Sequence, residues 1–157
     1  MDVAADTIET YIRLAFAGMA RALDQVDDES VNVRPGGWGT NTVAGLIVHC
    51  CELAPSWFES PGLGRESIRD RDSEFTTTST VAELRNRIET AAAKTCALVR
   101  EFDVGPTSQA HPLRDFLPGA DRTDGALVLH VLEELFQHLG HIEVTIDALA
   151  ATHRGHQ

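Results

Sequence analysis

Apolar residues recur at spacings of three and four along four stretches of the chain, which is the pattern of amphipathic helices. No stretch of comparable length alternates apolar and polar residues, so the sequence predicts an all-α fold. We expect the helices at about residues 3–26, 40–60, 80–102 and 125–151. The residues expected to face inward are Ile8, Ile12, Ala15, Met19 and Leu23 in the first helix, Val43, Ile47, Cys50, Ala54, Trp57 and Phe58 in the second, Leu84, Ile88, Ala91, Thr95, Leu98 and Phe102 in the third, and Val128, Leu135, Ile142 and Ile146 in the fourth.

Side chains that cap helix N-termini stand at the start of each stretch. The expected caps are Asp6 with Glu9 and Thr80 with Glu83, both spaced as capping boxes, Thr40 or Asn41 for the second helix, and Thr123 or Asp124 for the fourth. Pro61 and Gly62 should end the second helix near residue 60. Pro55 lies inside that helix and is expected to kink it, because proline lacks an amide donor.

The connections between the helices are too long for simple hairpins, above all the polar stretch at residues 61–79. We therefore expect a four-helix bundle with long crossover connections. The 157 residues fit a single domain, expected at residues 1–152, with a frayed tail at residues 153–157.

Charge narrows the classes of partner. The chain has 24 acidic and 13 basic side chains, a net charge of −11, and no cluster of five or more basic residues. Such an excess of negative charge repels phosphate backbones and anionic lipids, so nucleic-acid and membrane partners are disfavoured. The cysteines Cys50, Cys51 and Cys96 match no disulfide framework or metal motif, and the acidic N-terminus is unlike a signal peptide. We expect a cytoplasmic protein.

The fourth helix carries the candidate chemistry. At about 100° per residue, His130, Glu134, His138 and His141 fall within a sector of roughly 80°. This polar strip borders the apolar stripe of the same helix, only about 100° further round. Three imidazoles and a carboxylate are therefore expected beside the interior of the bundle.

Polar groups at such a position are costly unless they are hydrogen-bonded or bound to an ion, and a divalent metal satisfies imidazoles and a carboxylate together. Glu134 and His138 are one turn apart, and His49 lies midway along the second helix near its apolar face. Together they offer three ligands and leave one position open, the pattern of catalytic zinc. The alternative is a hydrogen-bonded core histidine and an ordinary surface pair of Glu134 with His138.

Several motifs give the chain a family resemblance in their order and spacing. They are the Gly37-Trp38 turn, His49, the Arg71-Asp72 and Glu74-Phe75 stretch, Thr80 to Glu83, and Glu134-x-x-x-His138-x-Gly140-His141. In these the sequence resembles the DinB-like superfamily, and within it the branch that includes the N-terminal domain of mycothiol-dependent maleylpyruvate isomerases.

The resemblance implies a four-helix bundle with a metal, commonly zinc, held by one histidine of the second helix and two residues of the fourth. These positions match His49, Glu134 and His138, although many relatives carry histidine where this chain has Glu134. It also implies that the thiol of a small cofactor such as mycothiol binds the open metal position.

Thiol activation by a metal is chemically reasonable, because a free thiol has a pKa near 8.5 and coordination to a dication deprotonates it. We therefore expect a metal-dependent thiol S-transferase that adds a low-molecular-weight thiol to a small electrophile. Maleylpyruvate isomerase activity is not expected, since that enzyme has a second, C-terminal domain. The alternative is a non-catalytic, metal-stabilised bundle that acts as a dimerising or partner-binding module, and a homodimer is plausible in either case.

Other residues carry weaker expectations. His141 is the candidate catalytic group, orienting a ligand or the bound thiol, with a core imidazole as the alternative, and His130 is equally ambiguous. Trp38 and Arg71 are candidate contacts of the thiol cofactor, whereas Trp57, Phe58 and the adjacent cysteines are expected to pack in the core. The arginines of the polar stretch could bind a substrate, but we expect them to form ion pairs in solvent with neighbouring acidic residues. The arginines are Arg65, Arg69 and Arg71, and the acidic residues are Glu66, Asp70, Asp72 and Glu74.

Overall fold

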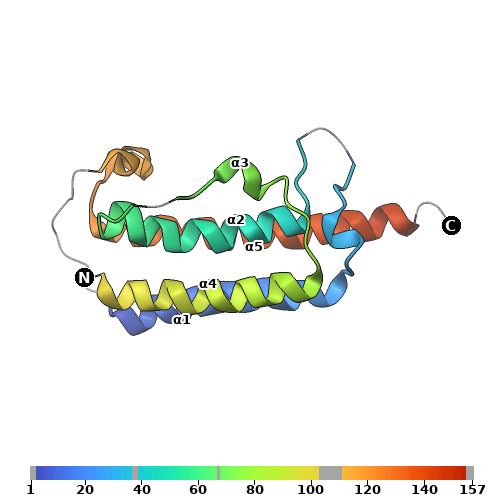
Figure 1. The fold of residues 1–157 in the computed structure, drawn as a ribbon, viewed down its shortest axis with the longest axis horizontal. Helices are drawn as coiled ribbons and strands as arrows, with labels where there is room; N and C mark the ends of the chain where they lie inside the picture. Colours follow the sequence, from blue (N-terminus) through green and yellow to red (C-terminus); the bar gives the residue numbers. More distant parts are fainter. Residues whose placement is uncertain (1–2, 37–38, 67, 103–110, 155–157) are drawn as a thin grey trace.

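The computed structural model describes residues 3–36, 39–66, 68–102 and 111–154, and its long elements are four helices (Figure 1). These are α1 (Ala5–Ala22), α2 (Val43–Trp57), α4 (Val81–Glu101) and α5 (Asp124–Arg154). No strand occurs among the described residues. The predicted all-α bundle of four helices is therefore confirmed.

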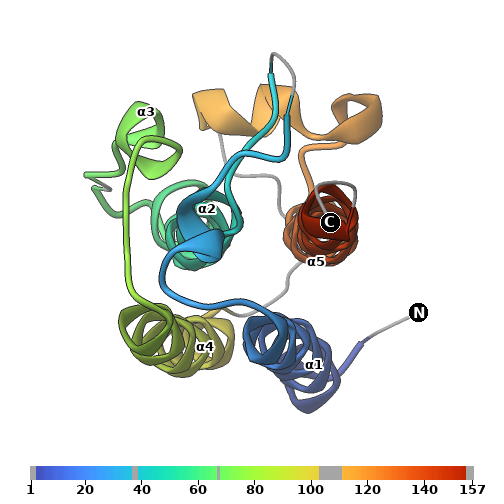
Figure 2. The same cartoon turned by 90° about the vertical axis from the view of Figure 1, so that its right-hand side faces the viewer.

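The order of the helices in space requires one long crossover. α1 and α2 each pack against α4 and α5, so α1 and α2 lie on one diagonal of the bundle and α4 and α5 on the other (Figure 2). α2 and α4 run in the same direction, opposite to α1 and α5 (Figure 1). The chain must therefore return along the bundle between α2 and α4, and the short helix α3 (Arg71–Glu74) forms part of this return. The predicted crossover is confirmed.

The inward faces predicted from helical periodicity form the core. All of the apolar residues expected on these faces are buried, from Ile8 on α1 to Ile146 on α5. Cys50 and Cys51 are buried free thiols, and burial raises the pKa of Cys51 to about 12. Both cysteines therefore serve as packing residues, as expected.

Two of the predicted helix starts are correct. Thr80 and Glu83 form the capping box of α4, each side chain accepting from the other's backbone amide. Thr123 caps the N-terminus of α5, because its Oγ1 accepts a hydrogen bond from the Ala126 amide at 3.2 Å.

The other two predicted caps are wrong. α1 is preceded by Ala4 without any side-chain cap, and Asp6 lies inside its first turn, where a negative charge complements the helix dipole. α2 is capped by Thr42, one or two residues later than expected, and its Oγ1 accepts from the Gly45 amide at 2.9 Å. Capping side chains at neighbouring positions look alike in a sequence, and the extended backbone of Thr42 decides between them.

The ends of α2 and α5 also differ from expectation. α2 runs through Pro55 to Trp57 and continues directly into a π-helical turn, η3 (Phe58–Gly62). α5 continues to Arg154 rather than ending at Ala151, so the first two residues of the expected tail are helical and residues 155–157 lie outside the described part. Among the described helices, none combines the length and hydrophobicity that a membrane span requires.

A buried arginine anchors the connection between α4 and α5 at the end of the bundle. This connection contains the short helices η4 (Pro112–Phe116) and η5 (Pro118–Ala120). Arg114 in η4 is fully buried; its guanidinium donates to the carbonyl oxygens of Pro61 and Arg122 at 2.8 and 2.7 Å and pairs with Asp124 at 2.7 Å. η4 is therefore held firmly against η3 and the start of α5.

Candidate metal centre

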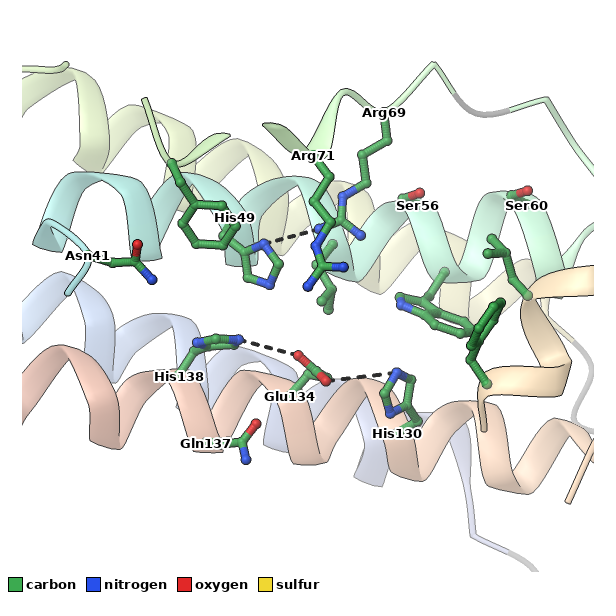
Figure 3. A pocket seen from close by; sticks show the side chains of 15 residues that line it. Asn41, His49, Ser56, Ser60, Arg69, Arg71, His130, Glu134, Gln137 and His138 are labelled. Carbon is green, nitrogen blue, oxygen red and sulfur yellow. Dashed lines mark hydrogen bonds and ion pairs between the residues drawn. The ribbon is translucent and has the colours of Figure 1, made fainter. Parts of the chain in front are cut away.

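The three residues predicted as metal ligands meet at the interface of α2 and α5 (Figure 3). His49 comes from α2, and Glu134 and His138 come from successive turns of α5. One ligand atom from each lies within 4.8 Å of the other two. The His49 and His138 ring centroids are 4.7 Å apart, and His138 Nε2 lies 3.3 Å from Glu134 Oε2. Two distant stretches of the sequence thus converge because α2 and α5 pack side by side.

A buried carboxylate orients the His49 ring. His49 Nδ1 lies 2.7 Å from Oε2 of Glu74, and both side chains are almost completely buried. Arg69 Nη2 also lies 3.1 Å from Nδ1, but a carboxylate accepts only, so Nδ1 must carry the proton and donate it to Glu74. The lone pair of His49 is then on Nε2. This is the tautomer that carboxylate partners impose on metal-binding histidines.

Glu74 and Arg69 correct the expectation that the arginines of this connection pair in solvent. Arg69 donates to both oxygens of Glu74, from Nε at 2.6 Å and from Nη2 at 2.9 Å, and Glu74 is only 2% exposed. Glu74 is therefore buried beside the candidate metal centre, and the half-buried Arg69 covers it. Arg65 instead forms an exposed pair with Glu101 on α4.

Gly45 permits this close approach of the crossover to α2. A Cβ atom at Gly45 would lie 3.2 Å from Oγ1 of the capping Thr42, 3.3 Å from the Phe75 Cα and 3.5 Å from the Glu74 carbonyl oxygen. Sequence reasoning missed the role of Glu74. The available signal was an acidic residue beside the apolar Phe75 in an otherwise polar stretch, which does not identify a partner 25 residues away.

The donor set fits a divalent ion. Two imidazoles and one carboxylate are the ligands of several catalytic zinc sites. Burial lowers the pKa of His49 and keeps its ring neutral, and the hydrogen bond from His138 lowers the pKa of Glu134 and keeps its carboxylate ionised. These are the protonation states that metal binding requires. His138 turns Nε2 toward Glu134, and its Nδ1 is buried without a hydrogen-bond partner among the described residues.

His130 lies one turn before Glu134 and borders the same space. Its ring stands edge-on to Trp57, with centroids 4.6 Å apart, and its Nε2 lies 4.0 Å from Glu134 Oε1. His130, Glu133 and Glu134 are also close enough to share an ion. This second group comes from one helix and includes the exposed Glu133, so the group formed with His49 is the better-built site.

A cavity of about 870 Å³ opens directly beside the three candidate ligands. Polar side chains contribute to its wall, among them Asn41, Arg69, Arg71 and Gln137. Apolar side chains also line it: Leu53 and Trp57 of α2, Phe75 at the end of α3, and Leu113 and Phe116 of η4. The volume is typical of a site for a small molecule.

The remaining predicted site residues have different outcomes. Arg71 lines the cavity, and Trp38 lies outside the described residues. His141 is exposed; its ring is nearly parallel to that of His138, with centroids 6.2 Å apart, and it is not part of the cavity wall. Phe58 is a core residue as expected, whereas Trp57 is both largely buried and part of the cavity wall.

Comparison with known proteins places this arrangement in a family. The family described as Mycothiol-S-transferase matches residues 7–149. A search of curated proteins finds no significant match.

Two solved structures resemble the chain. One is a crystal structure of the mycothiol-dependent maleylpyruvate isomerase, with 21% sequence identity and a TM-score of 0.62, and the other is a histidine-to-alanine mutant of that enzyme, with 21% identity and a TM-score of 0.61. In both cases the match covers 90% of this chain and 61% of the other, so this chain spans about three fifths of the length of those proteins. The match to the bundle confirms the resemblance predicted from the motifs. The chain therefore belongs to the mycothiol S-transferase family of DinB-like helical bundles.

Proposed function

We propose that this chain is a divalent-metal-dependent S-transferase that joins a low-molecular-weight thiol, such as mycothiol, to a small electrophile. The observation that carries the proposal is a cluster of three ligands, His49, Glu134 and His138, beside a cavity of about 870 Å³. An ion held by these three residues would have a coordination position left for a thiol. The family description, which names mycothiol, supports the choice of thiol.

Different residues of the chain would hold the ion and position the thiol. His49, Glu134 and His138 would hold the metal, most naturally zinc, and Glu74 orients His49 through Nδ1. When bound, the ion would supply the positive charge that lowers the pKa of a coordinated thiol. Arg71 supplies a cationic hydrogen-bond donor in the same wall, suited to the polar groups of such a thiol. Trp38 remains a predicted contact.

The transfer of the thiol to the electrophile needs no oxidant or reductant. The thiol loses its proton to solvent, and its sulfur forms a bond to the electrophilic carbon. In a substitution the leaving group departs with the bonding electron pair, and in an addition the neighbouring carbon takes up a proton. The chain needs only to bind the two reactants next to each other and to keep the sulfur in its thiolate form.

The alternative is a metal-stabilised bundle that serves only as a dimerising or partner-binding module. A structural zinc site is normally closed by a fourth protein ligand. Among the described residues, the group around His49 contains three candidate ligands and adjoins a cavity. This observation favours the transferase.

The test combines metal content with thiol-dependent turnover. The protein is purified without chelators, and its metal is counted. The metal-loaded protein is then incubated with mycothiol, glutathione or cysteine and monobromobimane. We expect about one divalent ion per chain and conjugation of mycothiol well above the protein-free rate. Metal near zero, or protein-free rates with every thiol, would overturn the proposal.

Histidine variants provide matched controls. His49→Ala and His138→Ala should lose both the ion and the turnover, because each removes a ligand. His141→Ala removes an exposed histidine of the same helix and should retain the ion. Its turnover then tests the predicted catalytic role of His141 separately from metal binding. Loss of the ion in all three variants would argue against the proposed ligand set.

A further inference from the structure

Apolar side chains of α2 and η4 line part of the cavity. The face of α2 that begins at His49 continues one turn later with Leu53 and two turns later with Trp57, and both line the cavity. Ser56, Ser60 and His130 lie on the side away from Asn41 (Figure 3). η4 closes this side, since Ser60 Oγ lies 3.2 Å from Nε2 of His111, the residue that caps η4. The part of the cavity beyond the metal cluster is therefore built by α2, η3, α5 and η4.

Large apolar side chains of η4 stand exposed in that part. Leu113 and Phe116 both line the cavity, yet they are 39% and 76% exposed. Covering exposed apolar side chains beside a concave surface with an apolar ligand removes them from water, which favours binding. Together with Leu53 and Trp57 of α2 they provide two walls of an apolar compartment that adjoins the candidate metal centre.

The exposure of these side chains does not come from a loosely held segment. Arg114 lies between Leu113 and Phe116, is fully buried, and binds the carbonyl oxygens of Pro61 and Arg122 as well as the Asp124 carboxylate. η4 thus presents its two apolar side chains from a fixed backbone. A preformed wall binds a ligand without the cost of ordering a loop.

On the basis of the proposed function, we infer that this apolar compartment is the electrophile subsite and that it selects electrophiles with a flat, aromatic substituent. The aromatic group lies among Leu53, Trp57, Leu113 and Phe116, and the reactive carbon faces the metal cluster. The polar side chains Arg71 and Asn41 are left for the thiol. Separate compartments for the two reactants bring them together at the ligand cluster.

For an aromatic α,β-unsaturated carbonyl compound the reaction is a simple addition. The sulfur forms a bond to the β-carbon, and the π electrons of the alkene move toward the carbonyl oxygen. The thiol has released one proton to solvent, and the α-carbon takes up one proton from solvent. No leaving group, oxidant or reductant is required. His130 lies at the border between the compartment and Glu134, where it can donate a hydrogen bond to such a carbonyl.

Two maleimides with the same reactive group test the subsite. N-phenylmaleimide carries an aromatic substituent and N-(2-hydroxyethyl)maleimide does not. Each enzymatic rate is divided by the rate of the same maleimide with mycothiol in the absence of protein, which corrects for their different intrinsic reactivity. We expect kcat/KM, so corrected, to favour the phenyl compound by about tenfold. Phe116→Ser and Leu113→Ser should each reduce this ratio several-fold. Phe136→Ser, which alters a partly exposed phenylalanine of α5 outside the cavity wall, should leave the ratio unchanged.

A binding measurement reads the subsite without turnover. N-phenylsuccinimide has the shape of the phenyl substrate but no alkene. The chain has two tryptophans, so Trp38→Phe leaves Trp57 as the single fluorescent reporter. We expect a saturable change in Trp57 fluorescence with N-phenylsuccinimide, about tenfold weaker affinity after Phe116→Ser, and no saturable change with N-(2-hydroxyethyl)succinimide.

The two measurements fail in different ways. Binding of the phenyl compound to an inactive protein would support the compartment and refute the proposed transferase. Turnover without a phenyl preference and without N-phenylsuccinimide binding would refute the compartment and leave the transferase standing. A preference that survives Phe116→Ser and Leu113→Ser would also overturn the inference.

Discussion

The Glu74 carboxylate accepts a hydrogen bond from Nδ1 of His49 across 2.7 Å, with both side chains buried. The two residues come from different parts of the chain, His49 from α2 and Glu74 from α3 in the crossover (Figure 1). The crossover therefore does more than connect two parallel helices. It supplies the carboxylate that fixes the orientation and tautomer of a candidate metal ligand.

Replacing Glu74 by glutamine should weaken metal binding. The substitution keeps the size of the side chain but removes the negative charge that holds the Nδ1 proton, and such changes usually cost about 10–100-fold in metal affinity. Competition with a chromophoric chelator measures the effect. Glu101→Gln, which alters an exposed acidic residue on α4, should bind as tightly as the wild type. Equal affinities for all three proteins would show that Glu74 does not act through His49.

Replacing Gly45 by alanine should disturb the same contact from the other side. A new Cβ would press on the capping Thr42 Oγ1 at 3.2 Å and on the Phe75 backbone at 3.3 Å, and we expect the second contact to move Glu74 away from His49. The usual stabilisation of a helix by Gly→Ala, about 0.5–1 kcal/mol, should therefore be lost, and metal affinity should fall.

Gly140→Ala is the matched control, because nothing lies within 4 Å of a Cβ at that helical position. It should be stabilised by about 0.5–1 kcal/mol and should bind metal normally. Urea unfolding of the apoproteins measures the first quantity and chelator competition the second. If Gly45→Ala behaves like Gly140→Ala in both measurements, the close approach at Gly45 is unimportant.

Removing one partner of the Arg114–Asp124 pair should strongly destabilise the protein. Arg114→Met leaves Asp124 as a buried carboxylate without its cation, which typically costs about 3–5 kcal/mol. Arg122→Met breaks the exposed pair with Asp115 in the same connection and should cost less than about 1 kcal/mol. The midpoints and slopes of urea unfolding give both values. Similar small losses for the two variants would contradict the anchoring role of Arg114.

The apoprotein should lose stability on acidification, beginning near pH 6.5. Burial lowers the pKa of His49 from 6.5. Below that pH, His49 is therefore protonated in the unfolded chain while it is still neutral in the folded chain. The pKa of Glu134 is lowered from 4.5, chiefly by its hydrogen bond with His138, so a further loss should begin near that pH. In both cases the unfolded state takes up the proton first, and the free energy of unfolding falls as the pH falls.

The measurement is urea unfolding in the presence of a chelator between about pH 7 and pH 4. His49→Gln removes one of the two groups and should show a shallower decline over this interval than the wild type. A stability that does not change with pH, or an equally steep decline in His49→Gln, would contradict the assignment.

Helical periodicity was sufficient for the elements and their inner faces, because both depend on residues three and four apart. Every apolar residue expected to face inward is buried, and the Thr80 capping box is present. The same local geometry placed Glu134 and His138 on one strip of α5. The errors at Asp6 and at the start of α2 were also local, since several neighbouring side chains could cap either helix.

The contacts between distant segments depended on the tertiary structure. That His49 reaches the strip on α5 requires α2 and α5 to be neighbours, and periodicity alone leaves the pairing of helices open. The burial of Glu74 beneath Arg69 could not be predicted, because a mixed-charge stretch looks the same whether it lies in solvent or against a helix. The apolar compartment beneath η4 likewise depends on the buried Arg114.

The amino-acid sequence by itself thus determined the four helices, their apolar faces, the three candidate ligands and the resemblance to the family. Only the tertiary structure decided which buried carboxylate orients His49, where His141 lies, and what forms the walls of the cavity. The physical reason is the range of the interactions. Helix formation and side-chain direction are set within a few residues, whereas the orientation of a ligand and the shape of a cavity depend on where the crossover and η4 meet the bundle.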